Sequence, residues 1–231
     1  MSPRNPGRFA GLLYLLVSIP GAFALLYVPG RLIVDGNATA TAANIAASGT
    51  LYRFGIAVQL ISQALFILVA LALYELLKGV SRGHATLMVI LILVAIPIAM
   101  LNELNAVAAL ALVRGADFLS TFEQPQREAL AMLFLDLHAR GLDVAGMFWG
   151  LWLFPLGVLV YRSRFLPRFL GMWLGLAGVA YVTLSLTAIL LPQYRDRVFV
   201  ISQPATIGEL AFMLWLVIKG ASPPRTSIEF D

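Results

Sequence analysis

The sequence contains no cysteine, and only 12% of its 231 residues are charged. The absence of cysteine excludes disulfide bonds, thiolate catalysis and metal sites that need cysteine ligands. The shortage of charge excludes an ordinary soluble domain, which needs far more charged side chains to cover its surface. In their place, 60% of the residues are hydrophobic and the mean hydropathy is +0.88. The composition therefore predicts a protein whose main solvent is lipid.

Histidine and buried lysine are scarce as well. His84 and His138 fall near opposite membrane faces of the predicted bundle, which disfavours bis-histidine haem, and Lys78 and Lys219 stand at helix ends, which disfavours a retinal Schiff base. No His-Glu-x-x-His or Gly-x-Ser-x-Gly pattern occurs. We therefore expect no cofactor and no metal, although zinc held by His138, Asp136 and a glutamate stays an open alternative.

The net charge of +4 arises from basic residues scattered among apolar runs. Scattered basic residues of this kind fit membrane orientation better than a nucleic-acid surface. We expect membrane lipids and a small or lipidic ligand as partners, and no nucleic acid. The sequence leaves the oligomeric state open.

Six apolar segments are long enough for a helix to cross a bilayer, which takes roughly 20 residues. Together they predict an all-α bundle of six transmembrane helices that forms one domain over residues 1–231. The first segment follows Arg4 and Arg8 as in a signal peptide, but no cleavage motif follows it, so we expect a retained helix. The six predicted spans are Phe9–Val28, Tyr52–Leu77, Thr86–Val113, Ala139–Tyr161, Phe169–Leu191 and Val200–Ile218.

The basic residues also predict the orientation of the helices. Both termini and two of the inter-helix segments carry most of them, and the positive-inside rule then makes both termini cytoplasmic. The cytoplasmic set comprises Arg4, Arg8, Lys78, Arg82, Arg162, Arg164, Arg168, Lys219 and Arg225.

Two inter-helix segments are long enough for helices lying at the membrane interface. Thr41–Ser48 is alanine-rich and is followed by Gly49, a favoured residue at the end of a helix. Pro125–His138 precedes the fourth span, either as an interfacial helix or as an extension above the membrane, and Pro125 suits the first turn of a helix. Within the spans, Pro20 and Pro155 predict kinks, because proline lacks the backbone donor that a helix needs.

Polar side chains are few in these spans, and each one needs a partner inside the bundle. Gln59 and Gln63 recur at helical spacing on one face of the second span, which begins near Arg53. The third span presents Asn102 and Glu103 towards its outer end.

The stretch around residue 138 carries the densest cluster of ionisable groups. Asp136, Arg140 and Asp143 form one helical stripe in which the arginine can bridge both acids, whereas His138 points away from that stripe. Glu209, about 15 Å from the cytoplasmic end of the last span, is the most deeply placed acid. Ionisable groups within a membrane are functional-site candidates by default.

Several stretches resemble the bacterial membrane family called domain of unknown function 4386. The resemblance covers nearly the whole chain and implies a multi-pass protein of the bacterial inner membrane, but it implies no known activity. Several members carry an acid where this chain has Gln59, which argues against a mechanism that needs a charge on the second span. The stretches are GRFAGLLYLL, LYRFGIAVQL, FLDLHARGLD, YRSRFLPRFLG and ATIGELAFMLWLVIKG.

The clustering of these groups in one half of the bilayer predicts an outward-facing polar cavity that binds or moves a small or lipidic molecule. A membrane enzyme acting on a lipid or isoprenoid-like substrate is one alternative, with His138 and either Glu103 or Glu209 as acid and base. An accessory subunit of a membrane complex is another, and purely structural helix packing is a third. The predicted lining comprises Arg53, Gln59, Gln63, Asn102, Glu103, Asp136, His138, Arg140, Asp143 and Glu209.

Overall fold

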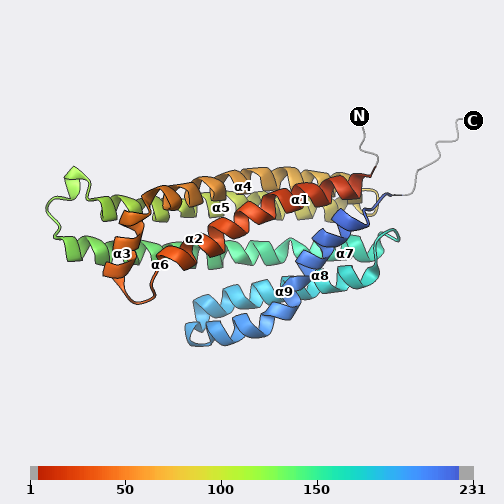
Figure 1. Cartoon of the computed structure of the whole chain (residues 1–231). Coiled ribbons are helices and arrows are strands. Elements are labelled where there is room, and N and C mark those ends of the chain that lie inside the picture. Colours follow the sequence, from red (N-terminus) through yellow and green to blue (C-terminus); the bar gives the residue numbers. More distant parts are fainter. Residues whose placement is uncertain (1–4, 224–231) are drawn as a thin grey trace, which may run out of the picture. The chain divides into compact units, whose positions relative to one another are not determined.

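A computed structural model describes residues 5–223, and within that range every regular element is a helix (Figure 1). Six helical stretches there are long and apolar enough to cross a membrane, which confirms the predicted all-α, multi-pass architecture. Arg4 and Arg225 of the orientation argument lie outside the described residues. The six stretches are Pro6–Leu32, Gly49–Leu77, Arg82–Arg114, Gln124–Arg162, Arg168–Leu190 and Pro192–Ile218.

The first span is irregular in its second half. Helix α1 (Pro6–Ala22) passes into a π-helical segment, η1 (Phe23–Tyr27), and then into the short α2 (Val28–Leu32). The irregularity begins directly after Pro20, which lacks the N–H that an α-helix would use at that position. The proline therefore gives rise to a wide π turn.

The segment between the first two spans contains the helix α3 (Ala38–Ala47). It begins earlier than predicted because the Asn37 side chain accepts a hydrogen bond from the Ala40 N–H at 2.9 Å and so caps the helix. Gly49, which was expected to end this helix, is instead the first residue of α4 (Gly49–Leu77).

The helix does not break between residues 138 and 139, so Pro125–His138 continues directly into the fourth span, in agreement with the alternative of an extension. After α5 (Arg82–Arg114) and the short η2 (Asp117–Leu119), a single helix α6 runs from Gln124 to Leu151 without interruption. The chain breaks instead at Trp152, before α7 (Leu153–Arg162). Pro155 explains this position, because it cannot donate a hydrogen bond to the Leu151 carbonyl one turn earlier.

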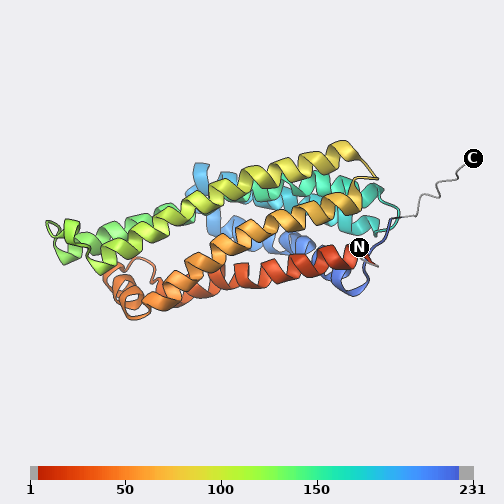
Figure 2. The same cartoon turned by 90° about the horizontal axis from the view of Figure 1, so that it is seen from above.

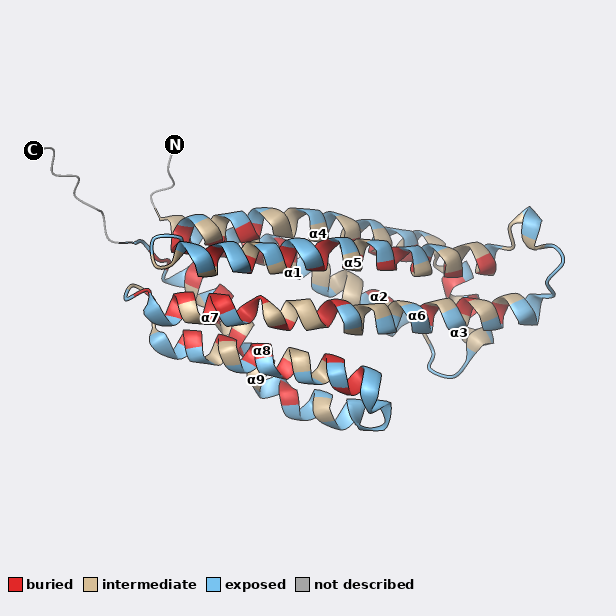
Figure 3. Ribbon diagram, turned by 180° about the vertical axis from the view of Figure 1, so that it is seen from behind, coloured by how far each residue is buried: buried red, intermediate tan, exposed pale blue. Residues whose placement is uncertain are grey.

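The last two spans form a helical hairpin. It consists of α8 (Arg168–Leu190), the short η3 (Pro192–Tyr194) and α9 (Arg195–Ile218). Helix α9 begins ahead of the predicted Val200. Along all the helices, buried and exposed residues occupy different faces, and many of the exposed ones are apolar, as lipid contact requires (Figure 3).

The described chain divides into two compact units. Among the described residues, unit 1 comprises 5–16, 66–94 and 146–223, and unit 2 comprises 17–65 and 95–145. The prediction of a single domain stays a prediction.

Glycine pairs hold the end of α6 and α7 close to α8 within unit 1. A Cβ on Gly157 would lie 2.7 Å from the Gly171 carbonyl oxygen, and a Cβ on Gly150 would lie 2.8 Å from the Gly178 carbonyl oxygen. Atoms cannot approach so closely, so both contacts require glycine. Small residues of this kind let transmembrane helices approach closely, and Gly171 and Gly178 do so here, whereas Gly175 faces open space.

The start of α1 is fastened to the end of α9, also within unit 1. Gly7 N–H donates to the Ala221 carbonyl at 2.8 Å, and the Arg8 guanidinium donates to the Ile218 carbonyl at 3.0 Å. One turn further on, Gly11 packs directly against Leu216. This antiparallel register carries Tyr14 towards the part of α9 that contains Glu209.

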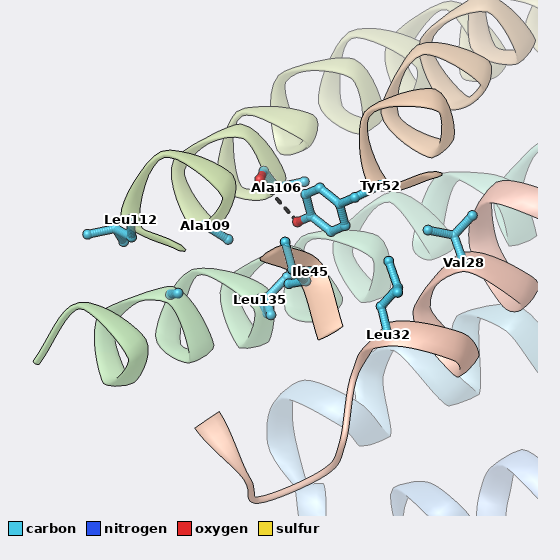
Figure 4. Close-up of a cluster of buried hydrophobic side chains, with 9 residues drawn as sticks. Val28, Leu32, Ile45, Tyr52, Ala106, Ala109, Leu112 and Leu135 are labelled. Carbon is cyan, nitrogen blue, oxygen red and sulfur yellow. Dashed lines mark hydrogen bonds between the residues drawn. The ribbon is translucent and has the colours of Figure 1, made fainter. Parts of the chain in front are cut away.

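In unit 2, the first half of α4 and the second half of α5 run side by side in opposite directions (Figure 2). A buried apolar cluster joins them to α2, α3 and α6, and the Tyr52 hydroxyl donates across it to the Ala106 carbonyl at 3.0 Å (Figure 4). The members of this apolar cluster are Val28, Leu32, Ile45, Tyr52, Ala106, Ala109, Leu112, Ala131 and Leu135.

Candidate functional site

Unit 2 brings Glu103 of α5 and His138 of α6 together. The His138 Nε2 atom lies 3.8 Å from the Glu103 Oε1 atom, and the Glu103 side chain is only 6% exposed. This separation is too long for a hydrogen bond. No hydrogen bond to the Glu103 carboxylate is found within the described part of the chain.

Asn102 fixes the orientation of the His138 ring. The Asn102 amide donates to the His138 carbonyl at 2.8 Å, while the His138 Nδ1 atom lies 3.2 Å from the Asn102 carbonyl oxygen. The Asn102 amide nitrogen lies 3.3 Å from the same Nδ1 atom, so Nδ1 either donates to the carbonyl or accepts from the amide, depending on the tautomer. In either tautomer, Nε2 is the ring nitrogen that faces Glu103.

Gly141 makes this arrangement possible. A Cβ at this position of α6 would fall onto the Asn102 side-chain oxygen, so only glycine leaves room for the amide. Asn105 donates to the same oxygen at 3.0 Å and completes the support of Asn102. Spacing within α6 alone gives no signal for this packing role of Gly141.

Gln59 belongs to the same unit and has an unsatisfied group. Its side chain is only 3% exposed, and its Oε1 atom has no hydrogen-bond partner among residues 5–223. Gln59 lies about two turns after Tyr52 along α4, and Glu103 lies about one turn before Ala106 along α5. Because the two helices are antiparallel, both residues lie on the same side of the Tyr52–Ala106 hydrogen bond, at neighbouring heights.

Other predicted lining residues are not gathered here. Arg53 is exposed on α4, and Gln63 is half-buried one turn beyond Gln59. Arg140 donates to Asp136 at 2.7 Å, but both side chains are more than half exposed, and the nearby Asp143 adds its charge to this pair. The predicted acid–base stripe therefore exists as a surface ion pair, on a different face of α6 from His138.

Glu209 belongs to unit 1 and has partners of its own. It accepts hydrogen bonds from the hydroxyls of Tyr14 and Tyr181. The Tyr14 ring is packed edge-on against Phe66, with the ring centres 5.5 Å apart, and at 6.3 Å from Trp152. The prediction had not identified these tyrosines, although a tyrosine within an apolar span is itself a signal, since its hydroxyl needs a partner there.

Gly208 and Trp173 position Glu209 on α9. A Cβ on Gly208 would lie 2.5 Å from the Trp173 ring, and the Trp173 indole donates to the Pro204 carbonyl at 3.0 Å. These contacts explain the glycine that precedes Glu209 in the chain.

Sequence reasoning also missed a half-open pocket of about 290 Å³ in unit 2. It lies between α3, the last turn of α5 and the first turns of α6. Thr39 donates to Glu128 at 2.6 Å, and Gln124 donates to the other carboxylate oxygen at 2.9 Å. The lining comprises Thr39, Ala42, Ala43, Ala46, Leu112, Val113, Gln124, Arg127 and Glu128.

A zinc site is not assembled in the described part of the chain. No three side chains among its histidines, aspartates and glutamates lie close enough to share a metal ion. Asp136 is bonded to Arg140 and points away from His138, so the ligand set that zinc would need does not form.

Comparison with known proteins adds a family but no activity. An uncharacterized protein of the archaeon Archaeoglobus fulgidus is 35% identical to this chain over 79 residues, and the match spans 34% of this chain and 46% of that relative. No solved structure matches the chain. The family model described as "Domain of unknown function (DUF4386)" matches residues 9–220. The chain therefore belongs to the DUF4386 family, as the resemblance of its stretches implied.

Proposed function

We propose that this multi-pass membrane protein binds or moves a small or lipidic molecule, and that Glu103 and His138 in unit 2 receive its polar end. The observation that carries the proposal is a set of polar atoms that make no hydrogen bond within the described residues. The Glu103 carboxylate and the His138 Nε2 atom face each other at 3.8 Å without a hydrogen bond, and Gln59 Oε1 is buried and unpaired.

The alternative of purely structural helix packing accounts poorly for these groups. Polar residues that join helices do so by bonding to one another, as Asn102 and His138 do through their backbone contacts. A buried polar group without a partner costs about 1–3 kcal/mol instead. Such a cost is expected at a binding site, where a ligand supplies the missing partner.

The geometry also supports proton exchange with the ligand. Asn102 orients the His138 ring with Nε2 towards Glu103, so a polar group bound beside both side chains can exchange a proton with the imidazole or with the carboxyl group. The same pair would serve as acid and base in the enzymatic alternative. We prefer binding to catalysis as the function, because His138 Nε2 and Glu103 Oε1 are 3.8 Å apart and both can still bond to a third polar atom.

The orientation with both termini in the cytoplasm belongs to this proposal. Helix α5 has 33 residues and is therefore about 50 Å long, well above the roughly 30 Å of hydrocarbon. The excess at its Arg114 end would project outside the cell, together with α3 and the first turns of α6. The pocket at that end would then be open to water, and Glu103 would lie deeper.

The test is to substitute Glu103→Gln in the full-length protein and purify it in mild detergent. We expect the folded yield to stay unchanged, while the mass of any co-purified small molecule falls at least several-fold in native mass spectrometry. Glu75→Gln is the matched control, because Glu75 forms an exposed ion pair with Lys78. Collapse of the folded yield of Glu103→Gln, with the control unaffected, would show instead that Glu103 is structural.

A further inference from the structure

The pocket between α3, α5 and α6 in unit 2 exists because one face of α3 has small side chains. Thr39, Ala42, Ala43 and Ala46 recur at helical spacing and all line it. Ala43 and Ala46 are exposed, so the pocket opens past them. Its volume of about 290 Å³ is at the small end of the range of ligand sites, ~300–1,000 Å³. The space fits a small molecule and is too small for a whole lipid.

The acid in this pocket, Glu128, is oriented by two hydrogen bonds and can accept further ones. Glu128 is only 9% exposed, and Thr39 and Gln124 each bond one of its carboxylate oxygens. A carboxylate has about four acceptor positions, so two remain for a further donor. No cationic side chain of the described residues lies within ion-pair distance of Glu128.

The pocket also contains one positive charge, Arg127. Its guanidinium lies against Gly115, just past the end of α5, where the carbonyl groups at the end of the helix favour a cation. Neighbouring residues on a helix point about 100° apart, so Arg127 and Glu128 offer two separate points of attachment.

These charges restrict the ligand. A simple cation would meet Arg127, and a simple anion would meet Glu128. A molecule with an ammonium and a carboxylate satisfies both charges, and its side arm can lie on the apolar wall formed by Ala46, Leu112 and Val113. We propose that this pocket binds a small zwitterion with an apolar side arm, of which an apolar α-amino acid is the simplest case.

This proposal goes beyond the proposed function, because it concerns a second site. Along α6, Glu128 is about 15 Å from His138. The buried apolar cluster of α3, α5 and α6, which includes Ala109, Ala131 and Leu135, occupies the stretch between them (Figure 4). Variants at the pocket and at Glu103 therefore test the two proposals separately.

The experiment is titration calorimetry of the purified full-length protein with valine, leucine and phenylalanine as probes. The controls are 4-methylpentanoate, which lacks the ammonium group of leucine, and 3-methylbutylamine, which lacks its carboxylate. We expect at least one amino acid to bind, and its counterparts with a single charge to bind roughly tenfold more weakly or worse.

Three variants localise the binding. Glu128→Gln should weaken it about tenfold by removing the ammonium partner, and Ala46→Leu should abolish it by filling the pocket. Ala47→Leu is the matched control, because Ala47 is exposed on α3 and does not line the pocket. The proposal is overturned if none of the three amino acids binds, if 3-methylbutylamine binds as well as they do, or if Ala46→Leu binds like the control.

Discussion

At the scale of single residues, two glutamates in the apolar helices have opposite surroundings. Glu209 accepts two tyrosine hydroxyls, and one of the tyrosine rings is packed against Phe66 and Trp152. Glu103 accepts no hydrogen bond from the described residues and faces a histidine nitrogen across a gap. We infer that Glu209 is mainly a structural link within unit 1, whereas Glu103 is kept available for a ligand.

Removal of one hydroxyl tests the structural role of Glu209. Tyr14→Phe keeps the ring contacts with Phe66 and Trp152 but removes a donor to a carboxyl group, so it should lower the free energy of unfolding by about 1 kcal/mol. Tyr194→Phe, at an exposed tyrosine, should have little effect. Unfolding in detergent, followed by tryptophan fluorescence, measures both variants. Equal stabilities would argue against the link.

The contact between Gly141 and Asn102 is the second feature at this scale. Gly141→Ala should push the Asn102 amide away from the His138 carbonyl and destabilise the protein by about 1–3 kcal/mol. Gly175→Ala is the matched control on α8, since a Cβ there meets open space. Alanine is the better helix former, so the control should be neutral or slightly stabilising. Thermal unfolding of the two variants side by side decides the matter.

At the scale of helices, prolines lie where the α-helical conformation is interrupted, and glycines lie where helices pack closely. Pro20 precedes the π-helical segment and Pro155 follows the break at Trp152. Glycines at four positions bring α7 and the end of α6 into backbone contact with α8. In lipid, such close packing replaces the hydrophobic effect as the force that joins helices.

A bulky residue in one of these glycine contacts should separate the helices. Gly171→Leu places a side chain where the Gly157 carbonyl and the Tyr161 backbone now lie, and neither is free to move. We expect a loss of several kcal/mol or failure to fold, seen as a fall in monodisperse yield on size-exclusion chromatography. A yield like that of Gly175→Ala would show that the close approach of α7 and α8 is dispensable.

At the scale of the whole molecule, the absence of cysteine provides a direct test of orientation. Thr121→Cys lies in the exposed segment between α5 and α6, and Gly83→Cys lies at the exposed start of α5. A membrane-impermeant maleimide should label residue 121 in intact cells and residue 83 only after permeabilisation. The reverse pattern would contradict the cytoplasmic placement of the termini.

Much of the fold could be predicted from sequence, because a helix in lipid must be apolar for its whole length. The boundaries were less accurate: α3 begins three residues before the predicted Thr41, at the local cap formed by Asn37, and α6 continues past residue 138. Helical spacing correctly separated His138 from the Asp136–Arg140 stripe. Spacing within one helix could not predict which helices meet, so it missed the two tyrosines at Glu209, the role of Gly141 and the pocket at Glu128.

The central claim is that Glu103 serves binding and contributes little to stability. The most direct measurement is the free energy of unfolding of Glu103→Gln compared with the unsubstituted protein, each purified to remove bound molecules. A neutral amide in place of a carboxylate that accepts no hydrogen bond should leave that free energy unchanged or raise it. A decrease of more than about 1 kcal/mol would contradict the claim, because it would show that the carboxylate already holds the helices together.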